Sequence, residues 1–317
     1  MNWQPSAKLG QLRARAVLLA RIRQFFAARN VLEVETPLLA GSGVTDPAVE
    51  PLLVERGASV PVPRYLQTSP EYAMKRLLAR DAEPIFQVAR AFRDGEAGAR
   101  HNPEFTLLEW YRPGFDHHRL MAEVVELVRY CLGERALHKY SYRSLFSELL
   151  ALDPFTASAA ELAAAARSHI DTGTLAGDRD LWLDLLMSHL IEPQLAALGM
   201  VLVYDYPASQ AALSRVVEVD GFQVGQRFEL YVDGVELANG YFELGDAGEQ
   251  RHRFEADNAR RREHCLPEHP LDEQLLAALA HGLPDCSGVA LGVDRLLMLA
   301  TGVSDMRQVL AFDWARA

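Results

Sequence analysis

The chain has 317 residues, and 43 Asp and Glu against 32 Lys and Arg give it a formal net charge of −11. This acidic balance argues against a broad nucleic-acid-binding surface, which needs clustered Lys and Arg. Hydrophobic residue types make up 49% of the chain, enough to exclude global disorder and to build a sizeable core. The three cysteines form no CxxC pair, and neither an apolar signal segment nor a membrane-length apolar run is visible. We therefore expect a reduced, cytoplasmic protein without a zinc site, a disulfide or a membrane span.

Hydrophobic periodicity and capping signals predict most of the secondary structure. Helices are expected at residues 7–29, from 69 onward, 117–132, 158–168, 181–198, 247–265, 271–281 and 293–301. Strands are expected at residues 31–36, 65–68, 85–92, 105–111, 201–204, 227–232, 235–244 and 289–291. Because Asp233-Gly234 is a strong hairpin signal, these elements predict an α+β fold with a mainly antiparallel sheet. No linker is visible, so we expect one domain over residues 1–317 with a mostly helical insertion near 141–200.

Common nucleotide-binding and hydrolase motifs are absent from the sequence. It has no GxGxxG after a strand and no GxxxxGK[ST], so the usual Rossmann and P-loop nucleotide sites lack support. It also lacks HExxH and GxSxG, the signatures of a class of zinc proteases and of the α/β-hydrolases.

A polar loop between two predicted strands carries the first candidate site. Arg93 begins this loop, and His101-Asn102-Pro103-Glu104-Phe105 closes it. An arginine there can hold a phosphate in a bidentate manner, and Phe105 can stack on a flat base. The loop can equally be a surface hairpin with ordinary charges, so this pattern alone leaves both interpretations open.

The predicted two-residue hairpin carries the second candidate site. Its turn pairs Tyr231 with Glu236 and puts Glu229 on the same face, diagonal to Glu236. Two carboxylates in this arrangement can hold Mg²⁺ beside phosphates. Glu243 is an odd step further and faces the other side, unless a bulge at Asn239-Gly240 restores its facing. A solvated acidic face on an edge hairpin is the alternative interpretation.

The segment from Gly288 to Arg295 is the third candidate site. Gly288 and Gly292 allow a backbone to approach a ligand closely. Arg295 is expected in the first turn of the following helix, where a cation opposes the helix dipole. Since packing alone rarely calls for that placement, it favours contact with a ligand. A strand-to-helix turn in which Asp294 pairs with Arg295 is the alternative.

Taken together and in this order, the three sites resemble motifs of the class II aminoacyl-tRNA synthetases. Val34-Glu35-Thr36-Pro37 resembles motif 1, whose proline lies at a dimer interface in that family. The loop from Phe92 to Phe105 resembles motif 2, and Gly288 to Arg295 resembles motif 3. The resemblance is to the lysyl, aspartyl and asparaginyl branch, and it is strongest to lysyl-tRNA synthetases.

Further stretches narrow the resemblance to the elongation factor P–(R)-β-lysine ligases. They are TSPEY at residues 68–72, HNPEFTLLEWYRP at 101–113, YPASQAAL at 206–213, ELANG at 236–240 and PDCSGVALGVDRL at 284–296. The resemblance covers nearly the whole chain and implies a class II synthetase catalytic core, with no room before motif 1 for an anticodon-binding domain. It also implies ATP and Mg²⁺ as cofactors, elongation factor P and (R)-β-lysine or lysine as partners, and a homodimer. A tRNA is not an expected partner.

The resemblance assigns a role to residues of each motif. It places the α-phosphate of ATP at Arg93, the outer phosphates at His101 and Arg295, and adenine between Phe105 and Arg295. The full set expected around ATP is Arg93, Asp94, Gly95, His101, Asn102, Phe105, Glu236, Leu237, Gly292 and Arg295, with Arg93 and Arg295 as the catalytic pair. Glu229 and Glu236 correspond to the glutamates near Mg²⁺ in the family.

The amino-acid substrate is expected at a separate group of residues. By resemblance, Ser69, Pro70 and Glu71 meet the amino group near the reacting carboxylate. Tyr111 and Glu243 take the distal ε-ammonium, since a carboxylate is the expected partner of a buried ammonium.

Two positions depart from the family pattern. Motif 2 usually reads Arg-x-Glu, but Gly95 stands where the acid is expected, so that Glu96 or the backbone is left to make its contact. Ala290 stands where lysyl-tRNA synthetases carry glycine. Because its methyl group would crowd an α-amino group, we expect Ala290 to favour a β-amino acid in the substrate pocket. A methyl group in a pocket contributes about 1–3 kcal/mol of discrimination.

The reaction implied by the resemblance has two steps. The substrate carboxylate attacks the α-phosphorus of ATP and pyrophosphate leaves, with charge stabilisation from Arg93, Arg295 and Mg²⁺. The acyl group then passes to a lysine ε-amine of elongation factor P, for which the sequence names no base. The alternatives are a truncated lysyl-tRNA synthetase-like enzyme that activates α-lysine and a catalytically inactive paralogue with a binding role. The second is disfavoured because Arg93, Arg295, Glu229 and Glu236 are all present.

Overall fold

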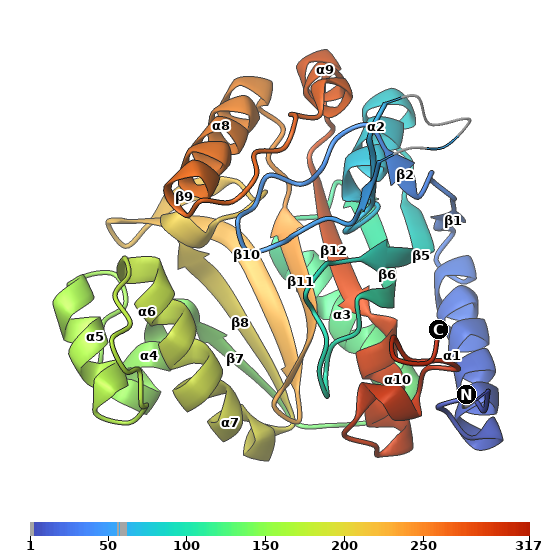
Figure 1. Cartoon of the computed structure of the whole chain (residues 1–317), viewed down its shortest axis with the longest axis horizontal. Coiled ribbons are helices and arrows are strands. Elements are labelled where there is room, and N and C mark those ends of the chain that lie inside the picture. The colour runs from blue at the N-terminus through green and yellow to red at the C-terminus, as the bar shows by residue number, and fades with distance from the viewer. Residues whose placement is uncertain (1–2, 56, 58–61) are drawn as a thin grey trace.

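The computed structural model describes residues 3–55, 57 and 62–317, and its centre is a nine-stranded sheet (Figure 1). The main path runs through β1 (Leu32–Glu33), β5 (Ile85–Phe92), β6 (Glu104–Pro113), β12 (Cys286–Gly292), β11 (Val235–Phe242), β10 (Phe222–Val232), β8 (Met200–Pro207) and β7 (Leu137–Ser141). In the described part of the chain only the outer pairs β1–β5 and β7–β8 are parallel. The remaining strands are β9 (Val216–Val219), which pairs with β10, and a small sheet of β2 (Leu39–Ala40), β4 (Arg64–Leu66) and β3 (Leu53–Val54). The predicted α+β fold with a mainly antiparallel sheet is confirmed.

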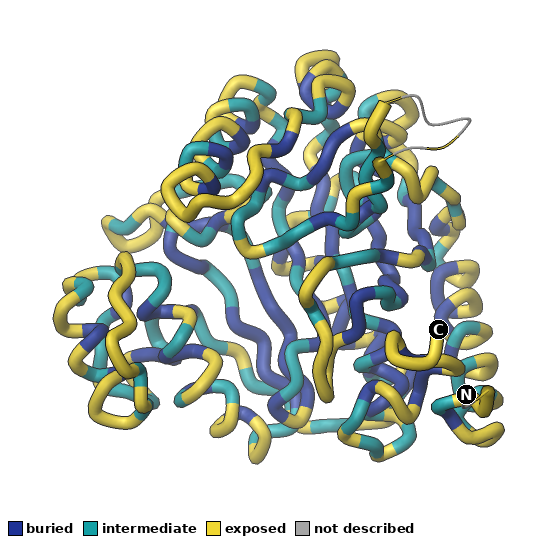
Figure 2. Tube along the Cα trace, viewed as in Figure 1, coloured by how far each residue is buried: buried dark blue, intermediate teal, exposed yellow. Residues whose placement is uncertain are grey.

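Three helices cover one face of the large sheet: α1 (Leu9–Ala27), α3 (His117–Leu132) and α10 (Val293–Thr301). Figure 1 shows α3 behind the strands, and Figure 2 shows the central strands buried along most of their length. On α1, Ile22 and Phe26 repeat at helical spacing and turn toward the sheet. Phe26 stacks on Phe86 with 4.4 Å between ring centroids and meets Trp110 edge-on at 5.3 Å. The main core therefore lies between this helical layer and the sheet.

Between β7 and β8 the chain is helical and packs against β8 in a second core. Its elements are α4 (Tyr142–Leu150), α5 (Ala159–Arg167), α6 (Arg179–Leu186), the π-helix η1 (Met187–Ile191), α7 (Glu192–Leu195) and the 3₁₀ turn η2 (Ala196–Leu198). The single helix predicted at 181–198 is thus wrong in its geometry. Pro193 has no backbone N–H to continue the α-helical ladder, and the chain changes register before it through π and then α turns.

Helices α2 (Glu71–Asp81), α8 (Ala247–Glu263) and α9 (Glu273–His281) lie at the top of the view in Figure 1. Of the 3₁₀ turns, η3 (Ala208–Gln210) follows β8 and η4 (Met306–Gln308) packs against α10. The helix predicted from Ser69 begins at Glu71, whose backbone N–H donates to the Ser69 hydroxyl at 3.0 Å. The strand predicted at 31–36 shrinks to β1, and its pairing ends before Pro37, which has no N–H to donate.

A buried arginine on α8 anchors the loop before β3. The Arg261 side chain is fully buried, donates to the carbonyl oxygens of Pro267 at 2.5 Å and Asp46 at 3.1 Å, and pairs with Glu50. The Glu50 carbonyl in turn accepts the backbone N–H of Asp94 at 2.8 Å. Through Arg261, helix α8 therefore holds the loop before β3 directly, and through Glu50 it also holds the loop that follows β5.

We expect Arg261→Met to destabilise the protein by about 2–4 kcal/mol, because it leaves two carbonyl oxygens and Glu50 without their buried partner. The matched control is Arg262→Met on the same helix, whose exposed ion pair with Glu268 contributes at most about 1 kcal/mol. Urea unfolding measures both changes. Equal losses in the two variants would contradict the anchoring role of Arg261.

Candidate active site

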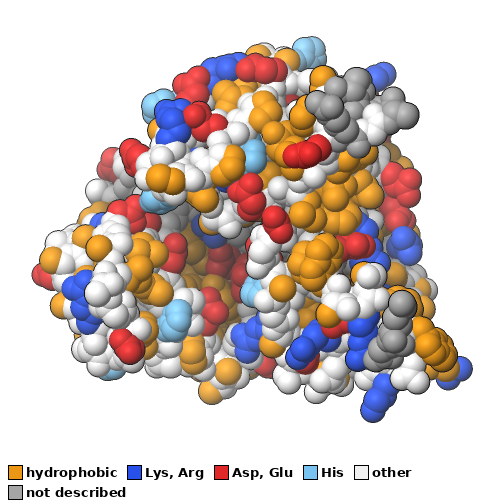
Figure 3. Space-filling view, in the orientation of Figure 1, with side chains coloured by type: hydrophobic (Ala, Val, Ile, Leu, Met, Phe, Trp, Pro, Cys, Tyr) orange, Lys and Arg blue, Asp and Glu red, His pale blue; other side chains and the backbone are white. Residues whose placement is uncertain are grey.

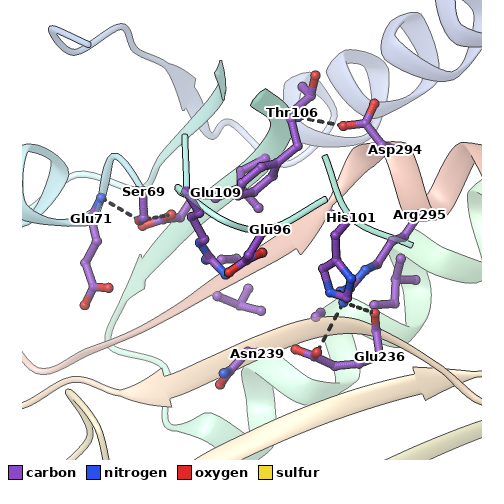
Figure 4. Close-up of a pocket in the computed structure, with 18 of the residues that line it drawn as sticks. Ser69, Glu71, Glu96, His101, Thr106, Glu109, Glu236, Asn239, Asp294 and Arg295 are labelled. Atoms are coloured by element: carbon purple, nitrogen blue, oxygen red, sulfur yellow. Dashed lines mark hydrogen bonds and ion pairs between the residues drawn. The ribbon is translucent and has the colours of Figure 1, made fainter. Parts of the chain in front are cut away.

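A pocket opens on the face of the sheet that α1 and α3 leave uncovered. Leu108 and Trp110 of β6 pack into the main core, and the alternate residues Glu109 and Tyr111 line the pocket, because successive strand residues face opposite sides. Strands β11 and β12 and the loop between β5 and β6 complete the wall. Figure 4 shows side chains from these elements converging on one space.

Most of the side chains predicted from the motifs line this one pocket. They are Ser69, Glu71, Arg93, His101, Asn102, Phe105, Tyr111, Glu236, Leu237, Glu243, Ala290, Gly292 and Arg295. The predicted site residues outside its lining are Pro70, Asp94, Gly95 and Glu229. The fold therefore brings together residues that are up to about 200 positions apart in the sequence.

Arg93 points its guanidinium into the pocket from the loop after β5. Its Nε is buried and has no hydrogen-bond partner among the described residues. Its Nη1 lies 3.7 Å from a carboxylate oxygen of Glu96, and its Cζ lies 5.1 Å from the centre of the Phe105 ring. Gly95 has a positive φ of 76° and turns the chain so that Glu96 lines the pocket. An unpartnered buried guanidinium nitrogen is suited to an anionic ligand.

Arg295 is the second arginine of the pocket and lies in the first turn of α10, as predicted. Its Nη1 donates to the backbone oxygen of Glu236 at 2.8 Å, and its Nη2 lies 2.8 Å from Nε2 of His101 (Figure 4). Burial and then the charge of Arg295 lower the pKa of His101, which favours a neutral imidazole that accepts this hydrogen bond. Asp294 pairs with Arg15 and accepts the N–H of Thr106 at 2.7 Å, so the predicted alternative of an Asp294–Arg295 pair is wrong.

The β10–β11 hairpin pairs Tyr231 with Glu236, as the sequence predicts. A register shift follows: Leu230 pairs with Ala238, which leaves Leu237 as an extra residue on β11. The bulge is therefore at Leu237 and not at the predicted Asn239-Gly240. Gly240 is needed for packing, since a Cβ there would lie 2.5 Å from the Phe228 ring.

The bulge decides which side chains of β11 reach the pocket. Because the extra residue shifts the alternation by one, Asn239, Tyr241 and Glu243 line the pocket together with Glu236. Glu236 and Glu243 thus face the same side of the sheet, as expected for a bulged strand, but the bulge that brings this about is at Leu237.

Glu229 lies behind the pocket wall and is held by protein donors. Its Oε2 accepts the hydroxyls of Tyr206 at 2.7 Å and Tyr231 at 2.6 Å, and its Oε1 pairs with Arg227 at 2.5 Å. Burial and then the charge of Glu229 raise the pKa of Glu236, whose side chain is 37% exposed. Because Tyr206, Tyr231 and Arg227 occupy the oxygens of Glu229, Glu236 is the carboxylate of this pair that faces the pocket, and one carboxylate beside phosphates can hold Mg²⁺. Among the described residues no group of three or more His, Cys, Asp or Glu is arranged to hold a metal ion.

Three carboxylates lie together in the pocket, those of Glu109 and Glu243, which are buried, and that of Glu71, which is partly exposed. Glu109 accepts the Ser69 hydroxyl at 2.7 Å and the Tyr111 hydroxyl at 2.6 Å. Burial raises the pKa of Glu109 to about 8 and the pKa of Glu243 to about 7. Glu71 is the third carboxylate, and its location is shown in Figure 4. The Tyr111 hydroxyl thus meets Glu109 in this structure, whereas the sequence predicts that it acts with Glu243.

The sequence predictions named Glu96 only as a replacement for the missing acid, and they did not name Arg100, Glu109 and Asn239 in the pocket or Lys75 beside it. Signals for two of them are present. Glu109 is two residues before Tyr111 on an otherwise apolar strand, which puts both on one face. Lys75 is four residues after Glu71, and this spacing pairs them on one helix face. Asn239 requires the bulge position, which no local pattern reveals.

Ala290 and Gly288 form part of the pocket floor on β12. Ala290 lies opposite Glu109 on β6 and opposite Asn239 on β11. A Cβ at Gly288 would lie 2.3 Å from the Tyr111 ring and 2.5 Å from a carboxylate oxygen of Glu243. Glycine at 288 therefore makes room for these side chains, and the Ala290 methyl faces the carboxylate end of the pocket.

The two ends of the described chain brace the loop between β5 and β6. The backbone N–H of Trp314 donates to the side-chain oxygen of Asn102 at 3.0 Å, and the N–H of Met306 donates to the Ala99 oxygen at 2.7 Å. Ser6 donates to Asp313 at 2.9 Å and so ties the N-terminal segment to the same region. The Asn102 side chain is thereby used for bracing.

A second, larger groove joins the pocket. It runs between the loop at 37–51, helix α8 and the start of α6, and it shares Ser69, Glu71, Arg93 and Tyr241 with the pocket. Figure 3 shows the surface hollowed in this part of the molecule. A long side chain can therefore reach the pocket from solvent.

Among the described helices none is both long and apolar enough to span a bilayer.

Comparison with known proteins agrees with this geometry. The family model for class II tRNA synthetases (D, K and N) matches residues 4–315. The chain is 48% identical over 314 residues to a protein of Pasteurella multocida, a match that covers 98% of this chain and 97% of the relative. It is also 48% identical to proteins of Pseudoalteromonas translucida, over 99% of this chain and 98% of the relative, and Yersinia enterocolitica, over 100% and 98%. All three relatives are named elongation factor P–(R)-β-lysine ligase. The matches confirm the predicted fold and resemblance.

We expect Glu109→Gln to change how stability depends on pH. A carboxyl pKa raised to about 8 favours the folded state below pH 4.5, and this contribution is lost as the pH rises through 8. Relative to the parent, the variant should therefore be more stable at pH 8 than at pH 5, by about 1.4 kcal/mol for each unit of pKa shift. Urea unfolding of the ligand-free protein measures this, with the exposed Glu104→Gln as control. A pH-independent difference would contradict the buried, protonated state of Glu109.

Proposed function

Because this chain belongs to the class II tRNA synthetase family and, within it, to the elongation factor P–(R)-β-lysine ligases, we propose that it is an ATP-dependent ligase. In this proposal it adenylates (R)-β-lysine and transfers it to a lysine ε-amine of elongation factor P. The observation that carries the proposal is a single pocket lined by two arginines, Arg93 and Arg295, and by the three carboxylates of Glu71, Glu109 and Glu243. Such a pocket suits a triphosphate next to an amino acid with two amino groups.

The nucleotide end of the pocket is formed by the two arginines. Arg93 would bind the α-phosphate with its guanidinium, whose Nε has no partner among the described residues, and Arg295 with His101 would bind the outer phosphates. Adenine would lie between Phe105 and Arg295. The other residues assigned to ATP are Asn102, Glu236, Leu237 and Gly292, and Glu96 replaces the acid missing at Gly95.

Mg²⁺ would be held by Glu236 at the pocket wall, supported by Glu229 behind it. When bound, the ion supplies positive charge that offsets the charge of the phosphates. Hydrogen bonds from Tyr206 and Tyr231 hold the Glu229 carboxylate in position. In this proposal its negative charge strengthens the attraction of Glu236 for the cation.

The amino acid would occupy the carboxylate end. Ser69, Glu71 and Glu109 would meet the amino group near the reacting carboxylate, and Glu243 with Tyr111 would meet the distal ammonium. The Ala290 methyl lies next to Glu109 in the sheet register and would crowd an amino group on the α-carbon.

In the first step, the substrate carboxylate attacks the α-phosphorus in line and pyrophosphate leaves, while Arg93 at the α-phosphate and Arg295 at the outer phosphates position the groups and stabilise the charge that develops. No protein base is needed because the carboxylate is already ionised. In the second step the acceptor amine attacks the mixed anhydride and AMP leaves. We propose that the acceptor lysine enters through the groove that shares Arg93 and Tyr241 with the pocket. A protein acceptor rather than tRNA suits the net charge of −11.

The proposal also concerns the organisation and place of the enzyme. Residues 1–317 would act as one catalytic domain, with the helices between β7 and β8 as its insertion. The reaction would take place in the cytoplasm, where the acceptor is a translation factor and the three free cysteines stay reduced.

The test of function is ATP–pyrophosphate exchange with (R)-β-lysine, with α-lysine and without amino acid, followed by the mass of elongation factor P. We expect strong exchange with (R)-β-lysine and its addition to the factor. Ala290→Gly should raise the activity with α-lysine relative to (R)-β-lysine by about tenfold, since a pocket methyl contributes 1–3 kcal/mol. Exchange with α-lysine alone would instead indicate a lysyl-tRNA synthetase-like enzyme. An unchanged ratio in Ala290→Gly would refute the role of the methyl group.

We further propose a homodimer formed on the motif 1 side. Leu32, Leu38, Leu39 and Leu53 are 53%, 40%, 43% and 48% exposed, and Figure 3 shows hydrophobic side chains gathered beside β2. We expect sedimentation to give about twice 35.3 kDa, and Leu39→Lys to shift the protein toward monomer. Val219→Lys, on exposed β9, is the control and should leave the mass unchanged. A monomeric parent protein would overturn this part of the proposal.

A further inference from the structure

Lys75 is a buried lysine beside the carboxylate end of the pocket, and no step of the proposed reaction uses it. Its side chain is 1% exposed, and it does not line the pocket. The ammonium nitrogen lies 2.7 Å from Oε1 of Glu71 and 2.6 Å from Oε2 of Glu243. One ammonium group therefore contacts both carboxylates that are expected to meet the substrate amino groups.

The packing around Lys75 does not call for a charge. Its neighbours on the same helix, Met74 and Leu78, are buried in an apolar cluster with Ile85. A methionine at position 75 would fill a similar volume without the cost of desolvating an ammonium group. Burial lowers the pKa of Lys75, but the charges of Glu243 and Glu71 outweigh burial and keep the pKa above its ordinary value. The ammonium state is thus maintained by the two carboxylates.

The charged and titratable groups around Lys75 are three carboxylates and two tyrosine hydroxyls. Three carboxylates meet at this end of the pocket, those of Glu71, Glu109 and Glu243, and Lys75 is the one ammonium among them. The Tyr111 and Tyr241 hydroxyls also face this space, and burial raises the pKa of both, so they stay neutral. In the empty pocket Glu109 holds a proton, because burial raises its pKa to about 8. When a substrate ammonium group displaces that proton, the three carboxylates and Lys75 leave an excess of two negative charges.

We propose that Lys75 is a positioning residue that determines specificity for substrates with two ammonium groups. It fixes Glu71 and Glu243 through one nitrogen and neutralises one of the three carboxylates, so that two negative charges remain for two substrate ammonium groups. Lys75 pairs with one oxygen of each carboxylate, which leaves the other oxygen of Glu71 for the ligand, whereas the other oxygen of Glu243 also lies beside the Gly288 backbone. This inference rests on the proposed function, because it takes the substrate to be a diamino acid.

The loss of Lys75 should weaken discrimination more than catalysis. Without the ammonium group, Glu71 and Glu243 repel each other and either separate or take up a proton. In both cases the pocket no longer presents two fixed charges at the positions of the substrate ammonium groups. The two arginines should be little affected, because Arg93 pairs with Glu96 and Arg295 with Glu236, and neither contacts Lys75 or its two carboxylates.

The experiment compares Lys75→Met with the parent in ATP–pyrophosphate exchange. The substrates are (R)-β-lysine and 3-aminohexanoate, which has the same carbon chain and lacks the distal amine. We expect the KM for (R)-β-lysine to rise by about tenfold or more and its preference over 3-aminohexanoate to fall by a similar factor. The KM for ATP and kcat should change little. Arg80→Met, an exposed position on the same helix, is the control and should match the parent.

The outcomes separate this inference from the proposed function. If the parent protein activates neither lysine isomer, the proposed function fails. If the parent is active and a folded Lys75→Met variant keeps the parental KM and preference, the inference alone fails. A uniform loss that also raises the KM for ATP would show a merely structural role and would overturn the inference too.

A second variant covers the case in which Lys75→Met does not fold. Lys75→Gln keeps an amide that can donate to both carboxylates but carries no charge. We expect it to unfold near the parental temperature and still lose the preference for the diamino acid. A Lys75→Gln variant with parental preference would show that the charge is not needed.

Discussion

One extra residue in β11 sets the chemistry of both ends of the pocket. Glu236 and Glu243 are seven residues apart, so a regular strand would send them to opposite faces of the sheet. The unpaired Leu237 shifts the alternation once, and both carboxylates reach the same space. Strand β11 and the residue that follows it thereby supply two acids to one pocket, Glu236 beside Arg295 and Glu243 beside Lys75. The distance between the Glu236 and Glu243 carboxylates is therefore set mainly by the backbone of the bulged strand.

The buried carboxylates in and behind the pocket are stabilised in three different ways. Glu109 is surrounded by hydroxyl donors, and its raised pKa means that the empty pocket can neutralise it with a proton. Glu243 is paired with the internal ammonium of Lys75. Glu229 is held by two tyrosines and an arginine outside the pocket lining. Buried carboxylates without partners would destabilise the fold, so each one is satisfied before any ligand arrives.

Sequence patterns predicted the elements that carry strong local signals. The limits of β5 and α3 and the Asp233-Gly234 turn were predictable because apolar periodicity, capping and positive-φ residues act within a few positions. The bulge at Leu237 was not, because it depends on how Phe228 packs against Gly240 across the sheet. The partners of Asp294 were missed for the same reason, since Arg15 is distant in the sequence. Motif resemblance located most pocket residues, but it could not reveal that Lys75 bridges two of them.

The braces on the β5–β6 loop also constrain how the molecule folds. Trp314 and Asn102 are separated by 212 positions, and Ser6 and Asp313 by 307. Contacts between such distant segments form late, because closing a long loop costs entropy before the contact repays it. The loop that carries Arg93 and His101 thus gains its last supports when both chain ends have docked. A partly folded chain therefore lacks a fully braced loop, and the pocket takes its final form only in the completed molecule.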